Sequence, residues 1–366
     1  MRLWDCCSVT KLNDGHVAKP TKAGQNWPRR RVLTSLLGAT AGLAGLAAPA
    51  FGSVLTASNS DLIGRMKTRI LTGRDTLLDV ARSLDLGILE LSAANPGVDA
   101  WVPGEERLIV LPTAHLVPNG VERDGIIVNL SELRLYYFPP QTTGADGTAQ
   151  VATSAIGIGR DGFDTPVGKS HVVRKKANPT WYPTAATRAD KPELPEIVGP
   201  GPDNPLGAHA IYLGWPTYLI HGTNKPLGVG RRISRGCIRM YPERVEALFG
   251  MVPVNAKVQV VEQSTKLGWH EGELYLEAHP DFDQLDELEA SYRFEPKTPI
   301  DMRDEIIAFA GNQAKRINWA AVRTVLTARR GFPEPITGRA SGYVEDIPLP
   351  DKPANTGGPR ALFPRT

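Results

Sequence analysis

The amino-acid sequence predicts a mainly β protein, with a small α/β module before the β-rich part and a helical, partly disordered extension after it. Three observations lead to this fold class. Short apolar runs separated by turn residues recur across residues 124–263, and two helical patterns lie between strand-like runs at 69–113. The apolar positions of 299–329 also repeat at helical spacing. A length of 366 residues suits two or three domains.

Residues 1–52 are expected to be an export signal. Three consecutive arginines at 29–31 precede an uncharged stretch, 32–52, that is rich in Ala, Gly and Leu. The triplet Ala48-Pro49-Ala50 is typical of a signal-cleavage site. The arrangement resembles a twin-arginine signal and predicts a periplasmic protein. An uncleaved N-terminal anchor is the alternative, because about 20 apolar residues can just span a bilayer.

The net charge of +3 is concentrated in this same segment. Residues 1–52 hold seven of the 42 Lys and Arg residues and two of the 39 acidic residues, which leaves 35 basic and 37 acidic residues elsewhere. Once the segment is removed, no basic excess remains to attract nucleic acid. A nucleic-acid partner is therefore not expected, and contact with a membrane is expected only through the signal segment if it stays uncleaved.

The cysteine content singles out one thiol. Of three cysteines, Cys6 and Cys7 lie in the signal segment, so the mature chain keeps only Cys237. A disulfide framework within one chain is thereby excluded. In an oxidising compartment a lone thiol is a liability unless it is buried or useful. A buried structural cysteine is the alternative to a functional one.

Residues 69–113 are expected to form a strand, two helices and a second strand. Asp75-Thr76 can cap a first helix, a second helix spans 88–94, and 108–111 is the closing strand. The unit resembles a LysM module, a fold that binds glycans containing N-acetylglucosamine, and residues 93–112 carry the best match. A small structural domain without glycan affinity is the alternative.

Residues 124–263 are expected to be strand-rich. A hairpin is predicted from 126–128 and 133–137. Further strands are predicted at 150–158, 170–174, 210–213, 217–221 and 257–261, with one helix at 242–250. Residues 175–207 are rich in Pro, Asn and Gly, and a loop of that length in a compact domain is usually functional.

The C-terminal extension, 264–344, has weaker signals. Residues 274–277 are expected as the last strand, and 281–289 as a solvated acidic face. Residues 299–329 are expected to be helical, with apolar positions at Ile306, Ile307, Phe309 and Ala310. The five prolines of 345–366 and the scarcity of large apolar side chains predict a disordered tail.

Two short segments carry candidate chemistry, 221–224 and 234–240. A cysteine nucleophile needs a base, a group that orients the base, and donors for the developing oxyanion. His221 follows the apolar run 218–220, so it is expected at a strand end, which is a rigid place for a base. Spacing alone leaves open a satisfied core histidine beside a buried cysteine.

The residues around Cys237 suit such a nucleophile. Gly236 permits a tight turn, so that the Gly236 and Cys237 amides can point at one oxygen. Arg235 and Arg239 are expected to add positive charge that favours the thiolate. The planar guanidinium of Arg239 also suits a substrate carboxylate.

These segments resemble a family signature. His221-Gly222-Thr223-Asn224 and Ser234-Arg235-Gly236-Cys237-Ile238-Arg239 are similar to the signature of the YkuD-type L,D-transpeptidases. The resemblance extends from Gly125 to about Val261 and includes the segments 165–168, 178–183 and 201–207. It implies a YkuD-type β-sandwich catalytic domain, and a LysM-like unit before it is typical of periplasmic members.

The resemblance also implies roles for individual residues. Cys237 would be the nucleophile and His221 its base, oriented by the carbonyl of Gly222, and the turn at Gly236 would supply oxyanion donors. The substrate-binding residues expected are Arg239, Ser234, Tyr212 and Trp181. Many members have His where this chain has Arg235, so the local charge differs while activity is expected to survive.

The implied reaction is acyl transfer on peptidoglycan tetrapeptide stems. The thiolate would attack the carbonyl of the diamino acid at stem position three, release the terminal D-alanine and leave a thioester. A neighbouring stem would then give a 3→3 cross-link, a lysine of an outer-membrane lipoprotein would tether that protein to the wall, and water would make the enzyme a carboxypeptidase or amide hydrolase. The sequence does not choose the acceptor.

Two other classes of function stay open from the sequence: a non-catalytic wall-binding protein and a general cysteine protease. No cofactor is expected. No metal is expected either, because no cluster of His, Cys and carboxylate residues has metal-ligand spacing.

Overall fold

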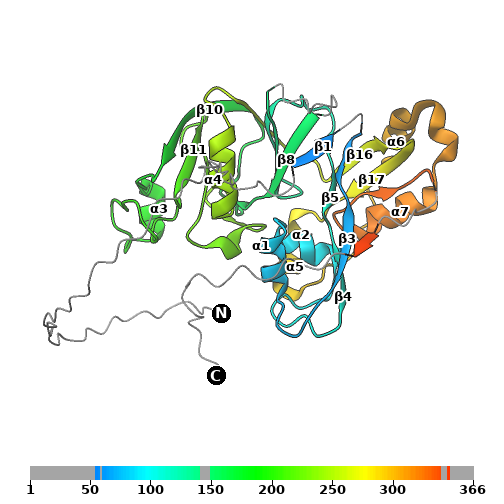
Figure 1. The fold of residues 1–366 in the computed structure, drawn as a ribbon, viewed down its shortest axis with the longest axis horizontal. Helices are drawn as coiled ribbons and strands as arrows, with labels where there is room; N and C mark the ends of the chain where they lie inside the picture. Colours follow the sequence, from blue (N-terminus) through cyan, green and yellow to red (C-terminus); the bar gives the residue numbers. More distant parts are fainter. Residues whose placement is uncertain (1–53, 58–59, 141–148, 339–343, 347–366) are drawn as a thin grey trace, which may run out of the picture. The chain divides into compact units, whose positions relative to one another are not determined.

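The computed structural model describes residues 54–57, 60–140, 149–338 and 344–346, all of which belong to one structural unit, residues 47–366 (Figure 1). The predicted export signal, residues 1–52, lies outside the described residues. So do residues 347–366 of the tail for which disorder is predicted.

A nine-stranded sheet, in the order β1-β8-β7-β6-β15-β10-β11-β12-β14, carries the residues singled out by sequence. Its strands are β1 (Val54–Ala57), β6 (Gly125–Asn129), β7 (Arg134–Phe138), β8 (Ala149–Ala155), β10 (Gly168–Ala177), β11 (His209–Leu213), β12 (Leu219–His221), β14 (Ile238–Arg239) and β15 (Lys257–Val261). The predicted hairpin is confirmed as the antiparallel pair β6–β7, and the strand predicted at 257–261 has the predicted ends. The predicted strand 150–158 is divided into two, and the other predicted strands of 124–263 are present with shifted ends.

The apolar runs of this sheet are continuous because both faces of its middle strands are buried. Ile126 and Val128 of β6 pack into the largest core cluster, while Ile127 between them packs into a separate cluster on the other face. Tyr136 and Tyr137 of β7 divide in the same way. Side chains alternate between the faces of a strand, so a strand covered on both sides needs apolar residues at consecutive positions.

The region around 69–113 has the order β3 (Met66–Ile70), α1 (Leu77–Ser83), α2 (Ile88–Ala94) and β4 (Leu108–Leu111). β3 and β4 pair antiparallel, and Thr76 caps α1 by accepting from the Asp79 amide at 3.0 Å. Two short strands, β2 (Leu62–Gly64) and β5 (Ala114–Leu116), flank this unit. The apolar faces of α1 and α2 belong to the same core cluster as β6, so the helical unit packs directly on the sheet.

Buried polar contacts also join this helical unit to the sheet. Glu90 on α2 forms an ion pair with Arg134 on β7 at 2.7 Å, and both side chains are buried. Arg134 also donates to the carbonyl of Asp85 at 3.2 Å. Beside them, Gly87 and Gly230 approach so closely that a Cβ built on Gly230 would lie 2.3 Å from the Cα of Gly87. The α1–α2 corner is therefore seated on the segment between β12 and β14.

The C-terminal part adds a three-stranded sheet with helices beside it (Figure 1). Its elements are β16 (Thr265–His270), β17 (Glu273–Ala278), α5 (Phe282–Ser291), α6 (Arg303–Ala310), the 3-10 helix Gly311–Arg316, α7 (Trp319–Ala328) and β18 (Glu334–Pro335). The expectation that 274–277 is the last strand was wrong, because β18 pairs with β17 and β19 (Val344–Asp346) pairs with β3.

The acidic run 281–289 forms α5, and its acidic residues Asp283, Asp286 and Glu289 are exposed as expected, while Leu285 and Leu288 are buried on the other face of the helix. Asp281 caps that helix, where acidic side chains are favoured by the helix dipole. In 299–329 only two of the four expected apolar positions are buried: Ile307 and Phe309 are 39% and 37% exposed. No helix in the described residues is long and apolar enough to cross a membrane.

Candidate active site

The pairing of β12 with β14 brings the two candidate catalytic side chains to one face of the sheet. The strands are parallel, with Ile220 opposite Ile238 and His221 opposite Arg239. Ile220 and Ile238 both point into the main core. Because side chains alternate along a strand, His221 and Arg239 project from the opposite face, and Cys237, the residue directly before β14, follows the same alternation.

His221 is held in one orientation by the next residue. Its Nδ1 lies 2.5 Å from the carbonyl oxygen of Gly222. A carbonyl only accepts, so neutral His221 carries its proton on Nδ1 and presents Nε2 as an acceptor. Burial, together with the positive charge of Arg239, lowers the pKa of His221 to about 4. The side chain is therefore an uncharged base near neutral pH.

Cys237 is a free, half-buried cysteine directly before β14. Its thiol contacts the carbonyl oxygen of Thr217 at 3.4 Å. Burial raises the pKa of Cys237, against the opposing effects of a hydrogen bond from the Leu219 backbone and the charge of Arg239. The expectation that nearby arginines favour the thiolate is thus corrected: Arg239 acts in the expected direction, but loss of solvation outweighs it.

The turn before Cys237 is fixed by a threonine from a distant loop. Thr165, in the Thr-Pro-x-Gly segment, donates its hydroxyl hydrogen to the carbonyl of Gly236 at 2.8 Å. The C=O and N–H of a trans peptide point in opposite directions, so this bond turns the Cys237 N–H away from Thr165. Gly236 has φ +95°, and a Cβ there would lie 2.9 Å from the ring of Tyr218. Only glycine fits this turn.

Ser234 was expected to contact substrate, but its side chain is used within the turn that carries Cys237. It is buried, and its hydroxyl donates to the carbonyl of Cys237 at 2.6 Å. It stands on β13 (Arg232–Ser234), which runs parallel to β9 (Ile158–Gly159). The serine therefore closes the loop whose other side Thr165 holds.

Arg235 does not act on the thiol as expected. Its guanidinium pairs with Asp190 at the end of α3 (Ala185–Asp190) and lies over the ring of Phe163 at 4.6 Å. It is not among the groups that shift the pKa of Cys237. Its positive charge is paired within the 175–207 loop, and the expectation that activity survives this departure from the family pattern stays a prediction.

Tyr212 shares the face of the sheet that carries the candidate site. In the β11–β12 pair it is opposite Leu219, and Ile211 between it and Ala210 points into the core. The guanidinium of Arg174, opposite Tyr212 on β10, lies 3.4 Å from the centre of its ring. Sequence analysis missed Arg174, whose only signal is an arginine within a predicted strand.

Trp181 lies in the long loop expected to be functional. The loop holds α3, and its ends are gathered by Asn204, which is fully buried and donates to the carbonyls of Pro179 at 2.7 Å and Gly199 at 3.0 Å. Trp181 forms an isolated β-bridge with Val198 and is half-buried. No contact within the described residues links Trp181 to Cys237, so its role at the site stays a prediction.

One buried cluster in the described residues has the composition of a metal site. His115, Glu132 and Glu277 offer ligand atoms within 4.8 Å of one another. Lys266 already occupies that position: its Nζ lies 2.6 Å from Glu132 and 2.9 Å from Glu277, and its side chain is fully buried. The ammonium group of Lys266 therefore supplies the positive charge that the two buried carboxylates require. With that group in place, these residues do not fit a metal ion.

Comparison with known proteins places this fold and site in an enzyme family. The family model of YkuD, the L,D-transpeptidase catalytic domain, matches residues 123–260. A probable L,D-transpeptidase, ErfK/SrfK of Salmonella typhimurium, is 35% identical over 296 residues, which is 79% of this chain and 92% of that protein. The chain belongs to the L,D-transpeptidase family.

Two further proteins show how far the similarity extends. The probable L,D-transpeptidase YbiS of Escherichia coli strain K12 is 38% identical over 237 residues, 63% of this chain and 74% of that protein. The NMR structure of the catalytic domain from E. faecium L,D-transpeptidase covers 39% of this chain and 100% of that chain at 23% identity, with a TM-score of 0.29. Structural similarity at that level does not define the fold by itself.

Proposed function

We propose that this protein is a cysteine L,D-transpeptidase that acts on peptidoglycan stem peptides through a thioester at Cys237. The observation that carries the proposal is the register of β12 and β14, with His221 and Cys237 on one face and His221 Nδ1 bound to the Gly222 carbonyl. Membership of the L,D-transpeptidase family supports the same chemistry. A nucleophile beside an oriented base is the minimum that acyl transfer requires.

The acylation step starts from a neutral pair. The thiol hydrogen turns from the Thr217 carbonyl to Nε2 of His221 as Sγ attacks the carbonyl carbon of stem residue three. The oxyanion accepts from the Cys237 N–H, whose direction is set by the Thr165–Gly236 hydrogen bond. The imidazolium then gives its proton to the departing amine of D-alanine, and the thioester remains.

The second step regenerates the thiol. An acceptor amine gives its proton to His221 and attacks the thioester, and Sγ takes the proton back as it leaves. An amine of a neighbouring stem gives a 3→3 cross-link, and a lysine of a lipoprotein gives a protein attached to the wall. Water in the same position would release a tripeptide, which is the carboxypeptidase or hydrolase alternative.

Arg239 is proposed to receive the carboxylate of the stem. Its Nε is buried without a hydrogen-bond partner among the described residues. Its charge already acts on both His221 and Cys237, so it lies close to the reacting atoms. A planar guanidinium binds carboxylates through paired hydrogen bonds. Tyr212 and Trp181 are proposed to line the substrate path.

The remaining proposals concern place and attachment. A periplasmic location follows from the signal-like residues 1–52, with the twin-arginine route as the proposed export path. The helical unit around 69–113 is proposed to bind N-acetylglucosamine-containing glycan as a LysM-like module. Both would place the thiol beside its polymeric substrate.

One experiment separates the possible reactions. Purified protein is incubated with disaccharide-tetrapeptide, and the products are identified by mass spectrometry. Cross-linked dimer is expected, tripeptide alone would show a hydrolase, and no change would favour a non-catalytic wall protein. Cys237→Ala should abolish the products and also the mass adduct formed with a carbapenem. Dimer formation by Cys237→Ala would overturn the proposal.

A further inference from the structure

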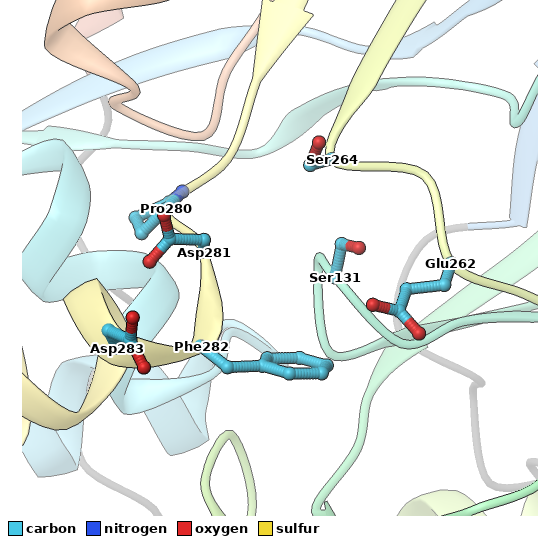
Figure 2. Close-up of a pocket in the computed structure, with 7 residues that line it drawn as sticks. All are labelled: Ser131, Glu262, Ser264, Pro280, Asp281, Phe282 and Asp283. Carbon is cyan, nitrogen blue, oxygen red and sulfur yellow. The ribbon is translucent and has the colours of Figure 1, made fainter. Parts of the chain in front are cut away.

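A cavity of about 370 Å³ lies among two strand connections and the start of a helix (Figure 2). Ser131 comes from the β6–β7 turn, and Glu262 and Ser264 come from the β15–β16 connection. The other side is the start of α5, from Pro280 to Asp283. The volume is in the range of small-ligand sites, and none of these residues has a part in the chemistry described above.

One wall of the cavity presents polar groups that lack partners. Ser131 is only 6% exposed, it lines the cavity, and its hydroxyl has no hydrogen-bond partner among the described residues. The side chains of Glu262 and Ser264 are likewise without a hydrogen bond or ion pair in the described part of the chain. Figure 2 shows these three side chains on one side of the cavity. The Ser131 hydroxyl is not among the fully buried unpartnered atoms of the described residues, so it is reached from the cavity, where a ligand can form a hydrogen bond with it.

The facing wall is largely apolar once its charges are paired. Asp281 is bound by Lys297 at 2.8 Å, and Asp283 is bound by the same lysine at 3.2 Å. Of the three carboxylates around the cavity only Glu262 is uncompensated, so the cavity is not primarily a trap for cations. The rings of Pro280 and Phe282 supply flat apolar surface on this side.

The Phe282 ring is held in place by an arginine of the β13 strand. The guanidinium of Arg232 lies 4.0 Å from the ring centre and donates to the Phe282 carbonyl at 3.5 Å. Arg232 is the first residue of β13, and the last, Ser234, closes the turn at Cys237. The apolar wall of the cavity and the candidate catalytic turn are therefore built on one three-residue strand.

We propose that this cavity is a saccharide subsite, which holds a sugar residue of the N-acetylhexosamine class from the glycan strand that bears the stem peptide. A pyranose has a flat C–H face that suits the Pro280 and Phe282 rings. Its rim of hydroxyls both donates and accepts, as Ser131, Glu262 and Ser264 require. The assignment of the glycan to peptidoglycan rests on the proposed function, and the subsite is distinct from the LysM-like unit at 69–113.

The test measures binding of triacetylchitotriose to the full chain by isothermal titration calorimetry. Measured in the Trp101→Ala background, so that the LysM-like unit does not contribute, the double variant Ser131→Ala, Glu262→Gln should bind the trisaccharide at least tenfold more weakly. Glu246→Gln, an exposed residue on α4 (Pro242–Met251), is the matched control and should bind as the parent does. Ser264→Ala, on the half-exposed connection, should weaken binding without disturbing the fold, as checked by its melting temperature.

Several results would overturn the subsite. They are absence of binding by the parent chain, and parent-like binding by the double variant and by Ser264→Ala. Loss of binding only in Trp101→Ala, an exposed aromatic of the helical unit, would assign the glycan to that unit instead. Binding of cadaverine that the double variant abolishes, with no binding of trisaccharide, would show an amine site.

Variants of the subsite and of Cys237 distinguish a failure of the subsite proposal from a failure of the proposed function. The double variant should still be acylated by a carbapenem at the parent rate, whereas Cys237→Ser should lose acylation and still bind the trisaccharide. Loss of trisaccharide binding with intact acylation is the expected pattern for the double variant. Acylation absent from the parent chain would defeat the proposed function and leave the subsite standing.

Discussion

Thr165 and Gly236, 71 residues apart in the chain, are joined by a hydrogen bond of 2.8 Å from the threonine hydroxyl to the glycine carbonyl. The same hydroxyl accepts from the amide of Gly159 at 3.3 Å. The Thr165 side chain thus links the backbone at Gly159 to the backbone at Gly236, the residue before Cys237. The direction of the Cys237 amide depends on this tie, because the peptide plane cannot rotate while its carbonyl is bound.

Replacing Thr165 with valine should slow acylation of Cys237 while the protein stays folded. The side chain keeps its shape but loses the hydrogen bond, so the Cys237 amide, the proposed oxyanion donor, is no longer held and the rate should fall by ~10- to 100-fold. The rate of carbapenem adduct formation, followed by mass spectrometry, measures this loss. Thr153→Val, which removes an equally buried hydroxyl from β8, should leave the rate unchanged. An unaltered rate in Thr165→Val would contradict the role given to the tie.

Gly236→Ala should be more damaging than the same change at Gly162. Both glycines have positive φ, +95° and +73°, but a Cβ at Gly236 meets the ring of Tyr218 at 2.9 Å, whereas a Cβ at Gly162 meets nothing. Gly162→Ala should cost only the backbone strain, about 1 kcal/mol. Gly236→Ala should in addition displace the turn and lower the acylation rate by more than ~100-fold. Equal rates for the two variants would argue against a demand for glycine at the turn.

The pH dependence of acylation should have its acidic limb near pH 4. His221 has a pKa of about 4, so it stays neutral and able to accept a proton at every higher pH, and protonation stops the reaction only below that value. The pKa of Cys237 is raised by burial, so thiolate forms only at alkaline pH. Acylation rates measured from pH 3.5 to 9 should therefore be flat across the neutral range. An acidic midpoint near the ordinary histidine value, about 6.5, would contradict a neutral pair.

Arg239→Gln tests the sign of both shifts. Removing the positive charge should raise the pKa of His221 and raise the pKa of Cys237 further, because Arg239 lowers both. The acidic limb of acylation should move to higher pH, and alkylation of the thiol by iodoacetamide should need a more alkaline solution. A limb that stays in place would show that burial alone sets the pKa of His221.

Lys266→Met should destabilise the fold strongly. The ammonium is fully buried between Glu132 and Glu277, and its charge keeps the pKa of Glu277 low against the effect of burial. Removal leaves two buried carboxylates without a cation, a loss of roughly 3–5 kcal/mol for a broken buried pair. Urea unfolding measures it. Lys257→Met, which breaks a solvent-exposed pair with Glu122, should change stability by less than about 1 kcal/mol and would reveal any general effect of the substitution.

Local signals predicted much of the central domain. The β6–β7 hairpin follows from consecutive apolar residues on both sides of a turn, and α4 begins at Pro242 as expected of a proline in a first helical turn. The cap of α1 at Thr76 is equally local. The motif around His221 also named Gly222, whose carbonyl does contact the histidine. In each case the partners lie within a few residues of one another.

Contacts between distant residues were beyond the reach of these signals. Nothing in the sequence pairs Arg235 with Asp190, so the sequence predicts instead that the positive charge of Arg235 acts on the Cys237 thiol. Lys266 has the composition of a surface residue, and its burial depends on Glu132 from a separate strand connection. Solvation was the other missing term, because the pKa of Cys237 depends on how deeply the folded chain surrounds it.

The α1–α2 corner packs on the segment between β12 and β14, so the catalytic region depends on the helical unit that precedes it in the chain. A fragment cut to residues 123–260, the stretch that the family model matches, would keep Arg134 but lose the carboxylate of Glu90 that neutralises it. It would also bare the apolar surface now covered by α1 and α2. Heating the intact chain should melt both parts in one cooperative transition, since neither has a complete interior of its own. The helical unit therefore cannot move independently, as a domain on a flexible linker would, and it fixes the position of the backbone at Gly230.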